Sequence, residues 1–155
     1  MTIYNVLINS NNRVAGGTTT SSANYYFNWG VFEEGEYLLT WGFTCSNVDT
    51  SINKMGLVSI NLGQSNVFTA SSTNVRATTT TIIGTIIPNE NDTSSFLYGD
   101  VNTNGVIRLN KPTSNEFTVE IRGLDGVLWT TSTGGTIPEY LLALNFQRIK
   151  KEKYD

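Results

Sequence analysis

The sequence predicts an all-β fold, a two-sheet antiparallel β-sandwich arranged as a single jelly roll of about eight to ten strands. Between residues 37 and 146, apolar residues recur at every second position in short runs, and polar turns separate the runs. A period of two is typical of half-buried strands, and no stretch between these runs has the period of a helix. Several connections are too long for a simple meander, which favours Greek-key crossings. An immunoglobulin-like sandwich fits less well, because that fold is shorter and carries paired cysteines.

Length and composition restrict the class of protein further. The chain has 155 residues, which predicts one domain spanning residues 1–155. Charged residues make up only 15%, whereas Thr, Asn and Ser supply about a third, so we expect a polar but weakly charged surface. The net charge of −3 argues against a nucleic-acid-binding protein, which needs clustered Lys and Arg. We expect no secretion signal and no membrane span, and we expect the single cysteine, Cys45, to be a buried thiol.

The first third of the chain predicts three strands and one long loop. Residues 2–9 form the first strand, with apolar residues on both faces, as in a strand that is covered on both sides. Residues 10–24 are rich in Asn, Gly, Thr and Ser and predict a flexible exposed loop or arm. Alternation returns at residues 25–31 and again at 37–45. Because an acidic turn separates these two runs, they are expected to form an antiparallel hairpin.

The middle of the chain predicts shorter elements. A polar connection at residues 47–54 leads to a strand at 58–62, and a turn then leads to a short apolar pair at 67–68. Residues 70–81 are almost all Ser and Thr, which have little to bury, and are expected to form a loop that feeds an exposed edge. The isoleucine-rich strand at 82–87 is apolar on both sides, which predicts a central strand or one beneath an interface.

The last third predicts a second hairpin and a central final strand. Short strands at residues 96–98 and 106–109 flank a turn cluster at 99–105. The Asp125-Gly126 pair is typical of a tight turn and predicts a hairpin between residues 117–121 and 127–131. The strand at 140–149 is long and apolar, as in strands at the centre of a sheet. A short basic tail at residues 148–155 follows.

The sequence argues against catalysis. It contains no histidine, which excludes Ser-His-Asp and Cys-His sites and the common zinc sites. A glycosidase needs only two carboxylates across a cleft. However, Glu33, Glu34 and Glu36 share one turn, while Glu116 and Glu120 lie opposite an apolar face, so all five are expected to face solvent. We predict that the protein is not an enzyme and has no cofactor.

Three groups of residues are candidates for contacts with a ligand or partner. Asp100, Asn102 and Asn104 alternate as oxygen ligands do in calcium loops, but the acidic side chains are too few for tight binding, and an ordinary turn is favoured. Trp29 and Trp41 are in phase with core residues, whereas Trp129 follows a turn and is the candidate for stacking on a sugar. The basic cluster is either a solvated tail or a contact with an acidic neighbouring subunit, and consists of Arg148, Lys150, Lys151 and Lys153.

Four segments carry a resemblance to a known class of proteins. They are YNVLINSNN (4–12), NLGQSNV (61–67), FLYGDVNTNGVIRL (96–109) and NEFTVEI (115–121). They resemble segments of small β-sandwich proteins encoded by large double-stranded DNA viruses of eukaryotes. The resemblance covers most of the chain and rests on strands and turns, not on a catalytic signature. It implies a minor capsid, penton-type or fibre-type protein, made in the host cytoplasm and located in the virion, where it contacts other capsid proteins and forms a homo-oligomer, a trimer or a pentamer.

A second resemblance implies a different function. Gly35-Glu36-Tyr37, which leads into an aromatic strand, is similar to the corresponding segment of trimeric heads of the tumour-necrosis-factor and complement C1q type. This resemblance covers a single hairpin. It implies a fibre head or binding module that recognises a carbohydrate or a host receptor through end loops such as residues 99–105 and 123–138.

Overall fold

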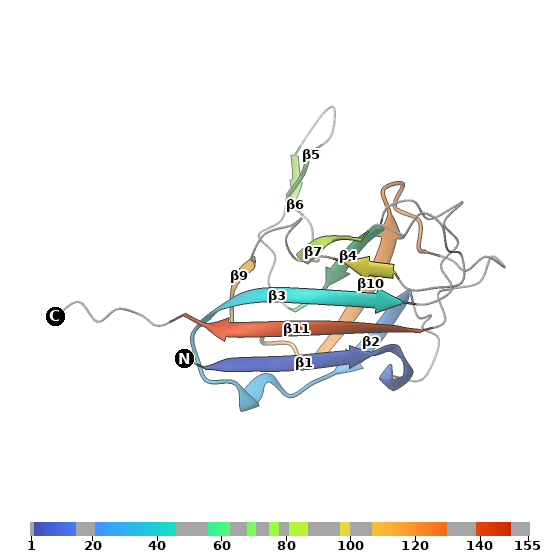
Figure 1. The fold of residues 1–155 in the computed structure, drawn as a ribbon. Helices are drawn as coiled ribbons and strands as arrows, with labels where there is room; N and C mark the ends of the chain where they lie inside the picture. The colour runs from blue at the N-terminus through green and yellow to red at the C-terminus, as the bar shows by residue number, and fades with distance from the viewer. Residues whose placement is uncertain are drawn as a thin grey trace.

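The computed structural model describes residues 2–14, 21–45, 56–62, 68–70, 75–77, 81–86, 97–99, 107–129 and 139–149. Two 3-10 turns are present, η1 (Ser10–Asn12) and η2 (Trp29–Val31). The strands, drawn in Figure 1, are β1 (Ile3–Asn9), β2 (Ser22–Tyr26), β3 (Glu36–Cys45), β4 (Gly56–Ile60), β5 (Phe68–Ala70), β6 (Val75–Ala77), β7 (Thr81–Ile86), β8 (Leu97–Gly99), β9 (Ile107–Asn110), β10 (Glu116–Gly123) and β11 (Tyr140–Arg148).

These strands form two antiparallel sheets, which confirms the predicted all-β sandwich. The first sheet has the order β1-β11-β3, and both β8 and β9 pair with the far side of β3, at its opposite ends. The second sheet has the order β2-β10-β4-β7. A separate ribbon of β5 and β6 follows β4 in the chain and extends away from both sheets in Figure 1.

The order of pairing is that of a jelly roll. The strands of the first half pair with those of the second half in reverse order: β1 with β11, β2 with β10, β3 with β8 and β9, and β4 with β7. The chain is therefore a long antiparallel ribbon rolled so that successive pairs alternate between the two sheets. The final strand, β11, lies between β1 and β3, as its apolar length predicts.

The core lies between the sheets and follows the alternation of the sequence. In β3, for example, Tyr37, Leu39, Trp41 and Phe43 are buried, and the residues between them are not. An aromatic cluster occupies the core near one end of the sandwich. The rings of Trp29, Phe32 and Tyr37 surround Phe146, and each lies within 6.2 Å of the Phe146 ring, centroid to centroid.

The predicted hairpin between residues 25–31 and 37–45 is wrong. β2 pairs with β10 in the second sheet, whereas β3 pairs with β11 in the first. The period of two ends at η2, where Asn28 Oδ1 accepts a hydrogen bond from Gly30 N at 2.9 Å. Trp29 Nε1 donates to Ser114 O at 2.9 Å and holds this turn in place. The chain therefore crosses between the sheets at η2 instead of folding back.

Four other predictions are corrected, one of them only in part. The region 10–24 is not all loop, because β2 begins at Ser22, and the Ser/Thr-rich region 70–81 contains β6. β6 consists of Val75, Arg76 and Ala77, which interrupt the Ser and Thr residues of this region, and Val is favoured in strands. β7 lies at the end of the second sheet and not at its centre, so of the two predicted alternatives only a strand beneath an interface stays a prediction. β1 is covered on one face only, since Ile3 and Leu7 are 50% and 67% exposed.

The tight turn at Asp125-Gly126 is confirmed, and Gly126 adopts a φ of 84° there. In the described residues, the return strand of the predicted hairpin is reduced to one bridge, between Arg122 and Leu128. Trp129 N then donates to Ile121 O at 3.0 Å.

Two tyrosines link the sheets inside the core. The hydroxyl oxygens of Tyr25 in β2 and Tyr140 in β11 lie 2.5 Å apart, and Tyr140 N donates to Ser10 Oγ at 2.9 Å. Burial raises the pKa of Tyr25 above its usual value. Burial, with a further contribution from Tyr25, raises the pKa of Tyr140 strongly.

These pKa shifts predict a loss of stability at alkaline pH. The folded state keeps the buried tyrosine hydroxyls neutral, and its full stability is present below pH 10, the ordinary tyrosine pKa. Above pH 10 stability is lost, because these tyrosines then ionise freely only in the unfolded chain. For one fully buried phenol the free energy of unfolding falls by ~1.4 kcal/mol per pH unit. Tyr140→Phe is expected to make this alkaline decline shallower in urea unfolding curves, whereas Tyr26→Phe, at an exposed position, should leave it unchanged. If the free energy of unfolding of both variants declined equally with pH, burial of Tyr140 would not be the cause of the alkaline loss of stability.

Candidate functional site

Apart from Glu36 at the start of β3, the three long strands carry no charged residue on the side of the first sheet that faces away from the core. We call the uncharged part of this surface the outer face; the register of β1, β11 and β3 brings its residues into rows across the sheet. None of its members is Asp, Glu, Lys or Arg. They are Ile3, Asn5, Leu7 and Asn9 of β1, Leu141, Ala143, Asn145 and Gln147 of β11, and Leu38, Thr40, Gly42 and Thr44 of β3.

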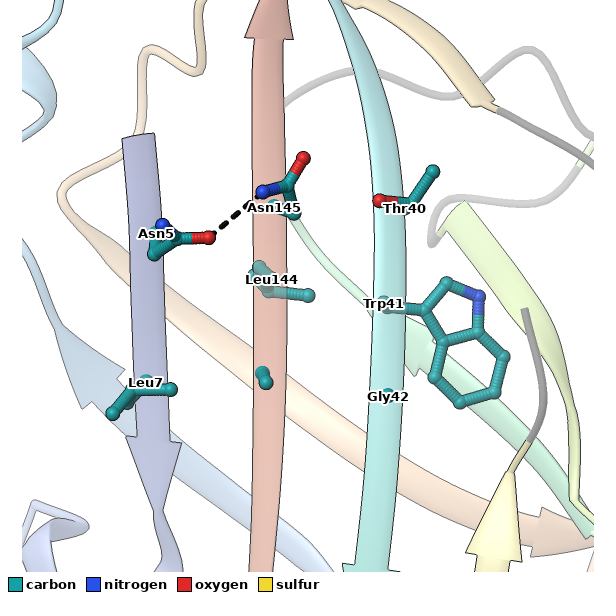
Figure 2. A pocket seen from close by; sticks show the side chains of 8 residues that line it. Asn5, Leu7, Thr40, Trp41, Gly42, Leu144 and Asn145 are labelled. Carbon is teal, nitrogen blue, oxygen red and sulfur yellow. Dashed lines mark hydrogen bonds between the residues drawn. The ribbon is translucent and has the colours of Figure 1, made fainter. Parts of the chain in front are cut away.

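Two adjacent rows of the outer face form a shallow hollow. In one row Asn145 Nδ2 donates a hydrogen bond to Asn5 Oδ1 at 2.8 Å, and Thr40 continues the row on β3 (Figure 2). In the next row, Ala143 and Gly42 are too small to fill the space beside Leu7. The hollow has a volume of about 340 Å³. Trp41 and Leu144 also line the hollow, at its base, and their side chains point away from it and are buried in the core.

The corresponding side of the second sheet is charged. There β10 presents Glu116, Glu120 and Arg122, and Arg122 Nε lies 2.6 Å from Glu120 Oε2. The two solvent-facing sides of the sandwich therefore differ in charge: the outer face is neutral, and the side formed by the second sheet is charged. Charged side chains are depleted from the buried centres of protein interfaces, so the outer face, and not the charged side, has the composition of a contact surface.

Charges gather at one end of the outer face, where they pair with one another. The acidic turn before β3 and the first residue of the strand supply three carboxylates. Glu36 Oε2 lies 2.6 Å from Arg108 Nη2, Glu34 Oε1 lies 2.9 Å from Lys111 Nζ, and Glu33 pairs with Arg148. These pairs are largely exposed, so each contributes at most ~1 kcal/mol to stability. Of the five carboxylates predicted to face solvent, Glu33, Glu34 and Glu116 are exposed, whereas Glu36 and Glu120 are partly buried. Glu33, Glu34, Glu36 and Glu120 are ion-paired.

Arg148 belongs to the sheet and not to a tail. It is the last residue of β11, and its guanidinium donates to Glu34 O at 2.6 Å in addition to its pairing with Glu33. This corrects the placement of Arg148 in a solvated tail, whereas its contact with another subunit stays a prediction. Lys150, Lys151 and Lys153 lie outside the described residues.

Trp129 is not an exposed ligand contact, contrary to the prediction. Its side chain is only 1% exposed, and its carbonyl oxygen accepts a hydrogen bond from Ser21 Oγ at 2.6 Å. The chain folds back after the Asp125-Gly126 turn, and the indole packs directly over Gly56 of β4, where the missing side chain leaves room for it. A buried ring cannot stack on a sugar.

The other candidate ligands remain predictions. Asp100, Asn102 and Asn104 lie outside the described residues. Within the ranges that the structure describes, no three His, Cys, Asp or Glu side chains gather as a metal site would require. No helix in the described part of the chain is long and apolar enough to cross a membrane.

No protein-family model matches this sequence, and no curated protein matches it. The function therefore has to be inferred from the outer face. The side chains there are amides, hydroxyls and aliphatic groups, which provide hydrogen bonds and apolar contact but no nucleophile or acid–base pair. Sequence reasoning noticed that Ile3 and Leu7 share a second apolar side of β1. It missed the surface, because β11, which joins β1 to β3 in the sheet, is more than a hundred residues away from β1 in the chain.

Proposed function

We propose that this chain is a non-enzymatic structural subunit of a virus particle, a minor capsid or penton-type protein. It acts through contacts with other capsid proteins and with copies of itself in a symmetric shell. The observation that carries the proposal is the uncharged outer face, on which Ile3, Leu7 and Leu141 are exposed while the opposite side of the sandwich is charged. A monomer that works alone in solution has no need of this asymmetry.

The fold is suited to this role. A jelly roll holds its surfaces on two hydrogen-bonded sheets, so the outer face is rigid and can be presented identically by every copy. The sequence resemblance to β-sandwich proteins of large DNA viruses supports the same assignment. The mechanism is geometric: the core makes a stiff block, and the outer face and the loops determine which neighbours it contacts.

The rival function, a glycan- or receptor-binding module, has lost its best candidate residue. An exposed aromatic plane is what such a site needs to stack on a sugar ring, and Trp129 is buried. Asn5, Thr40 and Asn145 remain as hydrogen-bonding groups around a hollow without an exposed ring. Such a site is better suited to a protein surface than to a pyranose.

The experiment is to purify particles from infected cells and to quantify this chain by mass spectrometry across a density gradient. We expect a constant ratio to the major shell protein in every particle fraction, retained after a high-salt wash. A chain that stays with the soluble proteins would contradict the proposal. Saturable retention of the purified protein on a glycan array, abolished by Asn5→Ala, would instead favour the rival function.

A further inference from the structure

We infer that the free edge of β1 pairs antiparallel with β1 of a second copy of this chain, about a two-fold axis at Asn5. This contact joins the first sheets of two copies into one continuous sheet and brings their outer faces side by side. The inference rests on the proposed function, because it names the partner and the surface through which the subunit assembles.

The first observation is that one side of β1 has unpaired peptide groups. Arg148 N donates to Thr2 O at 3.0 Å, so the even-numbered residues of this strand bond to β11. In an antiparallel ladder the groups of the alternate residues then point the other way. The N–H and C=O groups of Ile3, Asn5 and Leu7 therefore face outward, and within the described residues no backbone hydrogen bond reaches them.

The second observation is that this edge lacks the usual devices that prevent pairing. Edge strands are normally protected by charge, proline, a bulge or short length. β1 is seven residues long, IYNVLIN, and contains no charged residue and no proline. Leu7 and Ile3 remain exposed beside the unpaired groups.

The other edges are shorter, bulged or partly covered, and β5 and β6 of the separate ribbon have only three residues each. β8 and β9 are three and four residues long. β7 is paired through a register shift opposite Val58 and Ser59. β2 is covered in part, because Val14 N donates to Asn24 O at 2.8 Å on its outer side. Among the described strands, β1 is the edge best suited to a partner.

The third observation identifies the partner as a copy of the same chain. Each copy carries a net charge of −3, so two copies repel weakly, and their contact has to be made by a neutral surface. The outward residues of β1 are neutral, and an amide both donates and accepts, so the edge is complementary to itself. Self-complementarity is what a two-fold contact requires.

Chemical matching sets the position of the axis. With the axis at Asn5, Asn5 faces Asn5 of the other copy, and Ile3 faces its Leu7. The Asn5–Asn145 row then continues across the axis as a ladder of amides. With the axis at Val6, each Asn5 would face a leucine and each Ile3 would face Asn9. The first register pairs like with like and is the one we infer.

The experiment measures the mass of the full chain by sedimentation equilibrium over a range of concentrations. The wild-type protein is expected to dimerise. Leu7→Lys places a charged side chain opposite Ile3 of the other copy without touching the core, and it should weaken dimerisation by about 100-fold or more, since both symmetric Leu7–Ile3 contacts are lost and two ammonium groups lose water at the contact. Tyr26→Lys, on the exposed edge strand of the second sheet, is the matched control and should dimerise as the wild type does. Circular dichroism checks that both variants are folded.

A cysteine at the axis tests the register. In a Cys45→Ala background, Asn5→Cys should form a disulfide-linked dimer on mild oxidation, because residues facing each other across antiparallel strands have Cα atoms about 5.5 Å apart. Tyr26→Cys in the same background should stay monomeric on denaturing gels. A wild-type protein that is monomeric at all concentrations, a Leu7→Lys variant that dimerises normally, or a dimer that Asn5→Cys fails to cross-link would overturn the inference.

This outcome is separable from that of the proposed function. A chain that is found in particles at a constant ratio but does not pair through β1 leaves the structural role intact and removes the inferred contact. A chain that dimerises through β1 but is never found in particles supports the inferred contact and contradicts the proposed structural role in the virus particle.

Discussion

Phe146→Ala is expected to lower the free energy of unfolding by about 4 kcal/mol, since truncating a buried Phe removes its apolar burial and leaves a cavity. The ring is 0% exposed and lies 5.2 Å from Phe32 and 5.5 Å from Trp29, centroid to centroid. Phe146 therefore packs β11, the central strand of the first sheet, against the segment around η2 where the chain crosses between the sheets. Against a typical total of ~5 to 15 kcal/mol for a domain, this loss is a large share. Urea unfolding monitored by tryptophan fluorescence measures it.

Leu141→Ala is the matched control, because it shortens a side chain of the same strand on the opposite face. Leu141 is 39% exposed, so we expect a loss of about 1 kcal/mol or less. Comparable losses at the two positions would mean that β11 is not buried on one face only, which would contradict the two-layer arrangement.

Gly56→Ala is expected to destabilise the fold by about 3 kcal/mol, at the upper end of what overpacking a core usually costs. A Cβ on Gly56 would lie 2.6 Å from Trp129 Cε2 and 2.9 Å from Ile86 Cγ1. Both neighbours are buried, so the indole cannot move aside without opening the packing between β4 and β7. The shift in the urea midpoint at constant slope measures this loss.

Gly42→Ala is the control for that substitution. Gly42 is also in a strand, but a Cβ there meets no atom within 4 Å, since the position lies in the hollow of the outer face. Its stability should stay within about 1 kcal/mol of the wild type, with a slight gain from reduced freedom of the unfolded chain. If Gly56→Ala were equally mild, the contact between Gly56 and Trp129 would not exist as described.

Local pattern predicts the strands of this protein well, because alternation reports directly on which side chains meet the core. The strand at residues 37–45 and the final strand were both predictable in this way, and β11 lies at the centre of its sheet. Pairing partners were not predictable from neighbouring turns. The acidic turn at residues 33–36 looks like a hairpin turn, yet its carboxylates pair with Lys111, Arg108 and Arg148 from distant strands.

The candidate site could be predicted only in part, for the same physical reason. Apart from Glu36, one side of β1, β3 and β11 has no charged residue, and this is visible in each strand alone. The sequence gives no register, however, and the hollow exists only because Leu7, Ala143 and Gly42 share one row. Trp129 was misread because the feature that buries it, the missing side chain of Gly56, is more than seventy residues earlier in the chain.

Residue-resolved amide hydrogen exchange, compared between dilute and assembled protein, tests most directly whether this subunit works through the first sheet. The amides of Ile3, Asn5 and Leu7 face outward from β1, and we expect them to exchange rapidly in the dilute protein and at least about 10-fold more slowly after assembly. The amides of Asn24 and Tyr26 on the outer side of β2 are the internal comparison and should not change. Rapid exchange of the β1 amides in the assembled state, or new protection confined to the second sheet, would contradict the account.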